Sequence, residues 1–135
     1  MLNISTVAVL ALAALAQTAD VPAVAPPVHI AVNATTLAAL PRLTICATDE
    51  AGRTSAYRGV ALRDVLAKYG VPSGKAVRGK VMLRYVVVGA ADGYHVVFAL
   101  PELGASYTDR VVLVGEAKDG DAFPPAAGPY RIIVR

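Results

Sequence analysis

The chain has 135 residues, of which 56% are hydrophobic and 17% charged. This composition excludes an intrinsically disordered chain, and the length allows one domain with one core. The net charge is +3, but the 13 Lys and Arg are scattered, without a basic run or interleaved aromatic residues. The pattern therefore excludes a typical nucleic-acid-binding stripe.

The N-terminus has the features of an export signal. An apolar run extends over residues 7–16, and Ala14 and Ala16 place small side chains where a signal peptidase reads them. The run is shorter than the roughly 20 residues that span a bilayer. We predict a signal peptide over residues 1–16, a periplasmic or secreted location, and no integral membrane span after cleavage. An uncleaved N-terminal anchor is the alternative. A Pro- and Ala-rich linker follows over 17–27, and the domain is expected over 28–135.

The first predicted elements of the domain are short. Residues 29–32 are a candidate strand, and Thr35 or Thr36 is expected to cap a helical turn that Pro41 ends. Leu43–Thr48 and residues 53–57 then form a predicted hairpin around a four-residue loop.

The clearest helix in the sequence follows this hairpin. Leu62, Val65, Leu66 and Tyr69 have the i, i+3, i+4, i+7 spacing of one helical face. Gly70 stands where a glycine commonly ends a helix.

A second hairpin is predicted from residues 84–89 and 94–100. Its first strand is apolar on both faces over residues 85–88, which predicts a central strand covered on both sides. The remaining expected elements are a short helical turn at 101, a buried strand at 111–114, a turn at 119–120 and a final strand at 130–134. The sequence therefore predicts an α+β domain with a mixed or antiparallel sheet and one main helix.

General catalytic motifs are absent from the sequence. His29 and His95 have no metal-binding spacing with each other or with Cys46, the single cysteine. There is no Gly-x-Ser-x-Gly elbow, no Gly-x-Gly-x-x-Gly and no P-loop. Three aspartates are better explained as turn residues, namely Asp92, Asp119 and Asp121.

The order of several short segments is more informative than any one of them. Gly59, Val60 and Leu62 join a strand to the main helix, and Asp92-Gly93-Tyr94 follows in the second hairpin. Three further segments complete the series, at residues 99–103, 119–124 and 128–134. Over residues 30–134 this series resembles the sulfite-oxidase-type molybdopterin-binding domain, in particular its short, stand-alone, exported members.

The resemblance implies a site for a molybdenum ion held by a pterin dithiolene, at which oxygen atoms or electrons are transferred. Cys46 matches the position of the family's metal-ligating cysteine, and Tyr94 that of an active-site tyrosine. Arg131 matches an arginine that lies against the pterin phosphate, a role that suits a guanidinium. By this resemblance Cys46 is the candidate metal ligand, Tyr94 the candidate catalytic residue and Arg131 the candidate cofactor-binding residue.

The sequence also departs from the family's pattern. Cys46 lacks the usual Ala-Gly-Asn-Arg-type loop, no histidine precedes Gly128, and the chain ends before the family's Trp-containing tail, as if truncated at the C-terminus. The leader has no twin arginine to export a folded, cofactor-loaded protein. Enzyme activity is therefore left open. The alternative is a non-catalytic, cofactor-free module that holds a small anionic ligand or a partner protein. In that case Cys46 is a core cysteine, buried in apolar surroundings. A third reading is a thiol-based or structural envelope protein, in which an exposed Cys46 pairs with another chain.

Overall fold

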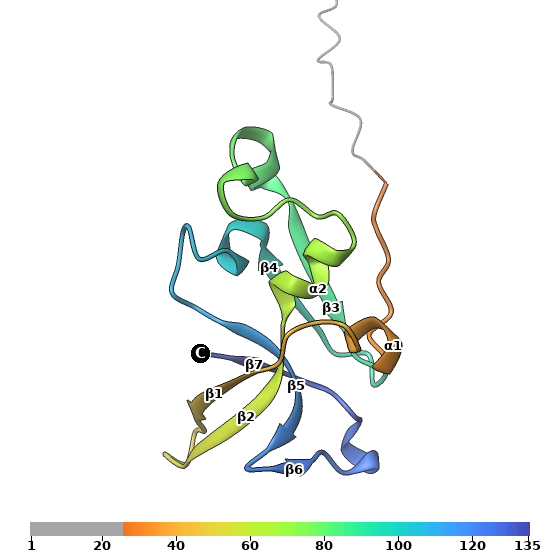
Figure 1. The fold of residues 1–135 in the computed structure, drawn as a ribbon, viewed down its shortest axis with the longest axis vertical. Coiled ribbons are helices and arrows are strands. Elements are labelled where there is room, and N and C mark those ends of the chain that lie inside the picture. Colours follow the sequence, from red (N-terminus) through yellow and green to blue (C-terminus); the bar gives the residue numbers. More distant parts are fainter. Residues whose placement is uncertain (1–25) are drawn as a thin grey trace, which may run out of the picture.

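The computed structural model describes residues 26–135 and shows an α+β domain (Figure 1). Every strand pairing in this range is antiparallel, and one helix of seven residues, α2, is the main helix. The helical elements are α1 (Ala34–Leu37), α2 (Leu62–Lys68) and the 3₁₀ turns η1 (Gly74–Ala76), η2 (Gly79–Leu83), η3 (Leu100–Leu103) and η4 (Pro125–Ala127). The strands are β1 (Leu43–Thr48), β2 (Thr54–Ala61), β3 (Tyr85–Gly89), β4 (His95–Ala99), β5 (Val112–Lys118), β6 (Asp121–Ala122) and β7 (Arg131–Val134).

The larger sheet has five strands in the order β1-β2-β5-β6, and β7 also pairs with β5. β5 is its central strand and is buried over its first four residues, as the apolar run at 111–114 predicted. The register of the β2–β5 pair shifts between Arg58 and Gly59. A Cβ at Gly59 would lie 2.0 Å from the carbonyl oxygen of Val114, so only glycine fits at this position.

The main helix packs on the larger sheet. Leu62, Val65 and Leu66 are buried against β2 and β5, and Gly70 adopts a left-handed conformation with φ of 77° just beyond the helix. Both features confirm the predicted helix and its C-terminal glycine. The core cluster joins this helix to the neighbouring elements through Leu37, Val60, Val77, Phe98, Leu100, Leu103, Val112 and Val114.

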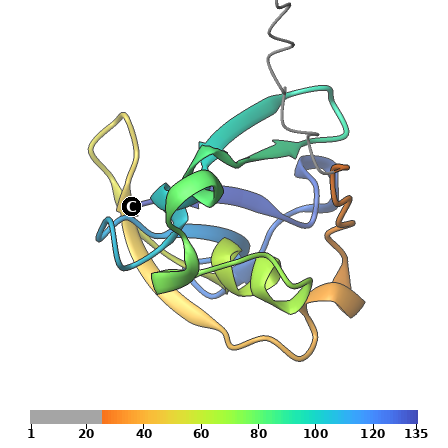
Figure 2. The same ribbon diagram turned by 90° about the horizontal axis from the view of Figure 1, so that it is seen from above.

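The second hairpin, β3–β4, forms a separate two-stranded sheet (Figures 1 and 2). Val86, Val88, Val96 and Phe98 face the core, whereas the alternate residues are exposed. The hairpin itself confirms the sequence prediction, but the prediction of a central strand covered on both faces is wrong. The apolar run over 85–88 hides the alternation because the residues that face solvent are apolar as well.

Two predictions for the start of the domain are also wrong. Residues 29–32 form no strand, and the cap of α1 is Asn33 instead of Thr35 or Thr36. The Asn33 side-chain oxygen accepts a hydrogen bond from the Thr36 backbone N–H at 2.8 Å. The predicted signal peptide and most of the predicted linker lie outside the described residues. Within residues 26–135, no helix has the length and apolar character needed to cross a membrane.

Candidate functional site

Cys46 lies in the middle of β1, the edge strand of the larger sheet, and pairs with Ala56 on β2. Its side chain is exposed because β1 directs Ile45 into the protein and Thr44 and Cys46 out of it. The interpretation of Cys46 as a core cysteine is therefore wrong. An exposed thiol is sterically able to meet a metal or a second chain.

Tyr94 lies in the turn at the tip of the β3–β4 hairpin, one residue before β4. Its backbone N–H donates to the Asp92 carboxylate at 3.0 Å, and its carbonyl accepts from the Ala90 N–H at 2.8 Å. These contacts confirm Asp92 as a turn residue. The Tyr94 side chain is 68% exposed, so the turn holds its backbone and leaves the ring in solvent.

Arg131 begins β7, where it pairs with Gly115 of β5. Its guanidinium carbon lies 4.9 Å from the centre of the Phe123 ring, within the range of a cation–π contact. β2 and β5 separate the strand of Cys46 from the strand of Arg131, so three strand spacings of about 4.8 Å place them roughly 14 Å apart across the sheet.

The three candidates thus occupy separate places in the fold. No hydrogen bond or ion pair within residues 26–135 joins Cys46, Tyr94 or Arg131 to another of the three, and neither of the two main surface pockets is lined by any of them. The same part of the chain has no group of three or more His, Cys, Asp or Glu side chains able to hold a metal ion. Neither of these two pockets therefore brings Cys46, Tyr94 and Arg131 together.

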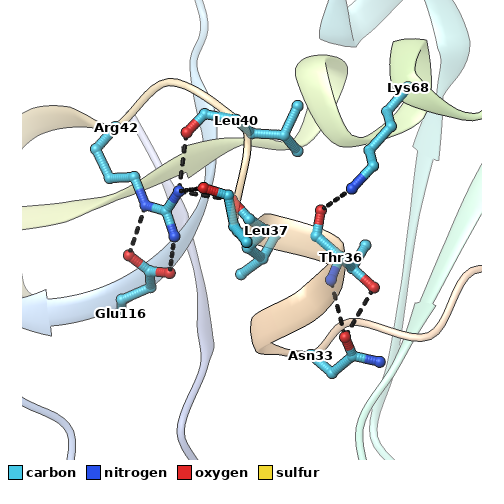
Figure 3. A network of polar contacts seen from close by, with 8 residues as sticks. Asn33, Thr36, Leu37, Leu40, Arg42, Lys68 and Glu116 are labelled. Atoms are coloured by element: carbon cyan, nitrogen blue, oxygen red, sulfur yellow. Dashed lines mark hydrogen bonds and ion pairs between the residues drawn. The ribbon is translucent and has the colours of Figure 1, made fainter.

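The larger surface pocket has a volume of about 310 Å³ and lies between residues 29–36 and the end of α2. His29, Asn33, Thr35, Lys68 and Tyr69 contribute to its lining. Lys68 is the lysine of the lining, and its charge would suit an anionic ligand. Its ammonium, however, donates a hydrogen bond to the Thr36 carbonyl at 2.8 Å (Figure 3). The Lys68 ammonium is therefore already used in a contact between α2 and α1.

Arg42 and Glu116 form the densest polar contact of the domain, and it serves the fold (Figure 3). The Arg42 guanidinium donates to both oxygens of the Glu116 carboxylate, at 3.0 and 3.2 Å. Its remaining nitrogen donates to the carbonyls of Leu37 and Leu40 at 2.6 and 2.8 Å. Arg42 thereby satisfies the end of α1 and fastens it to β5.

Two carboxylates within residues 26–135 have a lowered pKa, and both hold turns. The backbone N–H of Ala56 donates to Asp119 at 2.8 Å and, with a hydrogen bond from Ser55, holds the pKa of Asp119 below 3.8. The backbone N–H of Arg53 does the same for Asp49, whose pKa is also lowered. Neither group is shifted toward neutral pH, where a general acid or base would act.

The outer side of the β3–β4 hairpin is the feature that sequence reasoning missed. Tyr85 and Val87 on β3 and Val97 on β4 form this hairpin face, with Val87 directly opposite Val97. Tyr85 is 69% exposed and Val97 60%. The sequence does show a hairpin of two short strands, and a two-stranded ribbon has too few neighbouring strands to cover both of its faces. An exposed apolar face of this kind is typical of an interaction surface.

No protein-family model, curated protein or solved structure matches this chain.

Proposed function

We propose that the chain is a cofactor-free, non-catalytic binding module, with the fold of the sulfite-oxidase-type molybdopterin-binding domain, that holds a partner protein. The observation that carries the proposal is the hairpin face, where Tyr85, Val87 and Val97 are exposed side by side. Cys46 lies on β1, Arg131 on β7 and Tyr94 in the turn before β4, and this separation favours the binding role over oxo-transfer at a molybdenum site.

The backbone of the hairpin supports a partner that binds as an added strand. Leu100 N donates to Arg84 O at 2.9 Å and Ala90 N to Tyr94 O at 2.8 Å, at the two ends of the ribbon. Hydrogen-bonded pairs alternate with non-bonded ones in such a ribbon. The backbone groups of Tyr85, Val87 and Val97 are therefore directed to its outer edges, which pair with no other strand in residues 26–135.

Charge indicates the chemistry of this partner. The segment 65–91, which contains β3, has five Lys and Arg residues and no Asp or Glu. Arg84 lies next to Tyr85 and is exposed. An extended segment with apolar side chains at alternate positions and acidic residues at its ends would match both the face and its charge.

A peptide-display selection tests the proposal directly. A random peptide library is selected on the wild-type chain, and the affinity of enriched peptides is measured by fluorescence anisotropy on Val97→Glu. We expect peptides with alternating apolar residues and acidic ends, and a loss of about tenfold or more on Val97→Glu.

Val28→Glu is the matched control, because Val28 is a 65% exposed valine outside the hairpin. It should leave the affinity unchanged. Failure to enrich any peptide, or peptides equally sensitive to both substitutions, would overturn the binding role. Stoichiometric molybdenum in protein from a cofactor-competent host, lost in Cys46→Ala, would restore the oxidoreductase interpretation.

A further inference from the structure

A second surface lies at the end of the molecule formed by η1 and η2 (Figure 1). We call this surface the basic tip. All of its members are exposed, and each is either positively charged or apolar. They are Lys75, Arg78, Lys80, Met82, Leu83 and Arg84.

The large aliphatic side chains of the tip are unusually exposed. Leu83 is 82% exposed, the highest value among the exposed large hydrophobic residues of the described chain, and Met82 beside it is 40% exposed. Burial of such side chains is favourable in any apolar environment that the tip meets. Their position between Lys80 and Arg84 gives a short apolar patch bordered by cations.

The backbone under the tip is fixed by the core. Val77 is 2% exposed, and its carbonyl accepts a hydrogen bond from the Tyr107 hydroxyl. Val81 packs against the core cluster from within η2. Since these two anchors face the core, Arg78 and Lys80, which lie between them and are exposed, are presented from a fixed backbone.

The charge of the tip is uncompensated in the described part of the chain. None of its four cations takes part in an ion pair there. The 3₁₀ turn η3 packs against η2 and carries the carboxylate of Glu102. That carboxylate accepts from Ala99 N at 2.9 Å and lies 4.0 Å from Arg110, so it is already engaged.

Cations that surround exposed aliphatic side chains match the interface of an anionic membrane, where phosphates lie directly above the acyl chains. We propose that the basic tip docks the domain peripherally on an anionic phospholipid surface, with Leu83 and Met82 entering the interface. The tip adjoins the hairpin face at Arg84, and the proposal does not depend on the proposed function.

Vesicle partitioning of the full chain tests the proposal. Sedimentation would compare vesicles of phosphatidylcholine with vesicles of phosphatidylcholine and phosphatidylglycerol at 70:30, in 0.1 M salt. Residues 1–25 contain one Asp and no Lys or Arg, so any partitioning of that segment should depend little on lipid charge. We expect the wild-type partition coefficient to be at least tenfold higher on the anionic vesicles.

Matched variants distinguish binding by the tip from a general effect of net charge or of exposed apolar side chains. Arg78→Glu/Lys80→Glu should abolish the preference for anionic vesicles, since each cation near such a surface contributes roughly a fivefold factor. Arg58→Glu/Arg135→Glu changes the net charge equally and should keep the preference within about twofold. Leu83→Ser should weaken anionic binding severalfold, whereas Val28→Ser should not.

Three outcomes would overturn the proposal. The first is equal wild-type partitioning on both vesicle types. The second is an equal loss of binding in the tip and control charge variants. The third is tip-dependent binding to polyglutamate without binding to anionic vesicles, which would assign the tip to an acidic protein. Thermal unfolding of each variant checks that all remain folded.

Discussion

Replacement of Arg42 by methionine is expected to be among the most damaging single changes in the domain. Methionine keeps an unbranched apolar stem but removes every donor of the guanidinium. The change leaves the Glu116 carboxylate without its bidentate partner and the carbonyls of Leu37 and Leu40 without their charged donor. The side chains of Arg42 and Glu116 are each only 25% exposed, so solvent replaces these contacts incompletely.

The expected cost of Arg42→Met follows from these contacts. A hydrogen bond to a charged group contributes about 1.5–3 kcal/mol, and the contacts of one side chain are not additive. We therefore expect a loss of about 3 kcal/mol, a substantial part of the 5–15 kcal/mol typical of such domains. At roughly 4 °C per kcal/mol, the Tm should fall by about 12 °C.

Urea unfolding with a double-mutant cycle provides the assay. The cycle combines Arg42→Met with Glu116→Gln and measures the coupling of the two side chains, which should be about 1–2 kcal/mol. Arg42→Lys, which keeps the charge but loses the planar fork, should be intermediate. A cost below about 1 kcal/mol for Arg42→Met, or a coupling energy near zero, would refute the assignment of this pair as the attachment of α1.

Three further predictions address other contacts. Gly59→Ala should cost more than about 3 kcal/mol or prevent folding, because its Cβ would lie 2.0 Å from Val114 O; Gly104→Ala, whose Cβ would lie 3.8 Å from Pro101 O, is the tolerated control, and both are compared by thermal melts. The lowered pKa of Asp119 gives stability that is present well above the ordinary pKa of an aspartate and is lost progressively as the pH falls through the lower folded-state value. In Asp119→Asn the free energy of unfolding should therefore fall less steeply between pH 5 and pH 2 than in the wild type. An unchanged pH dependence would refute this role of Asp119. Cys46 should react with a thiol reagent in the native protein at a rate within about tenfold of the urea-unfolded rate, and strong protection would contradict its exposure.

The sequence predicted elements well where local signals and burial agree. The face formed by Leu62, Val65 and Leu66 and the glycine at 70 set both the existence and the end of α2. Leu43–Thr48 was predicted with its observed bounds, because its hairpin loop and its strand propensity act over a few residues.

The failures arise where several local signals compete or where a strand needs a partner that is distant in sequence. Asn33 caps α1 ahead of two threonines, because the Thr36 hydroxyl instead donates to the Ala31 carbonyl at 2.6 Å. Residues 29–32 have no strand to pair with, so their apolar character does not make them a strand. The burial of a strand depends in the same way on neighbours distant in sequence.

The candidate site was the least predictable part. Cys46, Tyr94 and Arg131 were selected by their order along the chain, and order does not determine which faces of two sheets converge. Cys46 and Arg131 are held in the larger sheet, while Tyr94 lies in the turn that joins the two strands of the smaller one. Their joint role therefore depended on a packing of sheets that the sequence does not specify.

The hairpin face and the basic tip come from one continuous segment, and the same physical arrangement produces both. In this segment, residues that anchor the backbone alternate with residues that face solvent: Val81 precedes Met82 and Leu83, and Val86 separates Tyr85 from Val87. The anchors pack against the core, so the exposed residues are presented from a fixed backbone. Fixed apolar side chains lose little conformational entropy on binding. This reasoning favours the segment between α2 and η3, rather than the dispersed residues Cys46 and Arg131, as the part of the domain through which it acts.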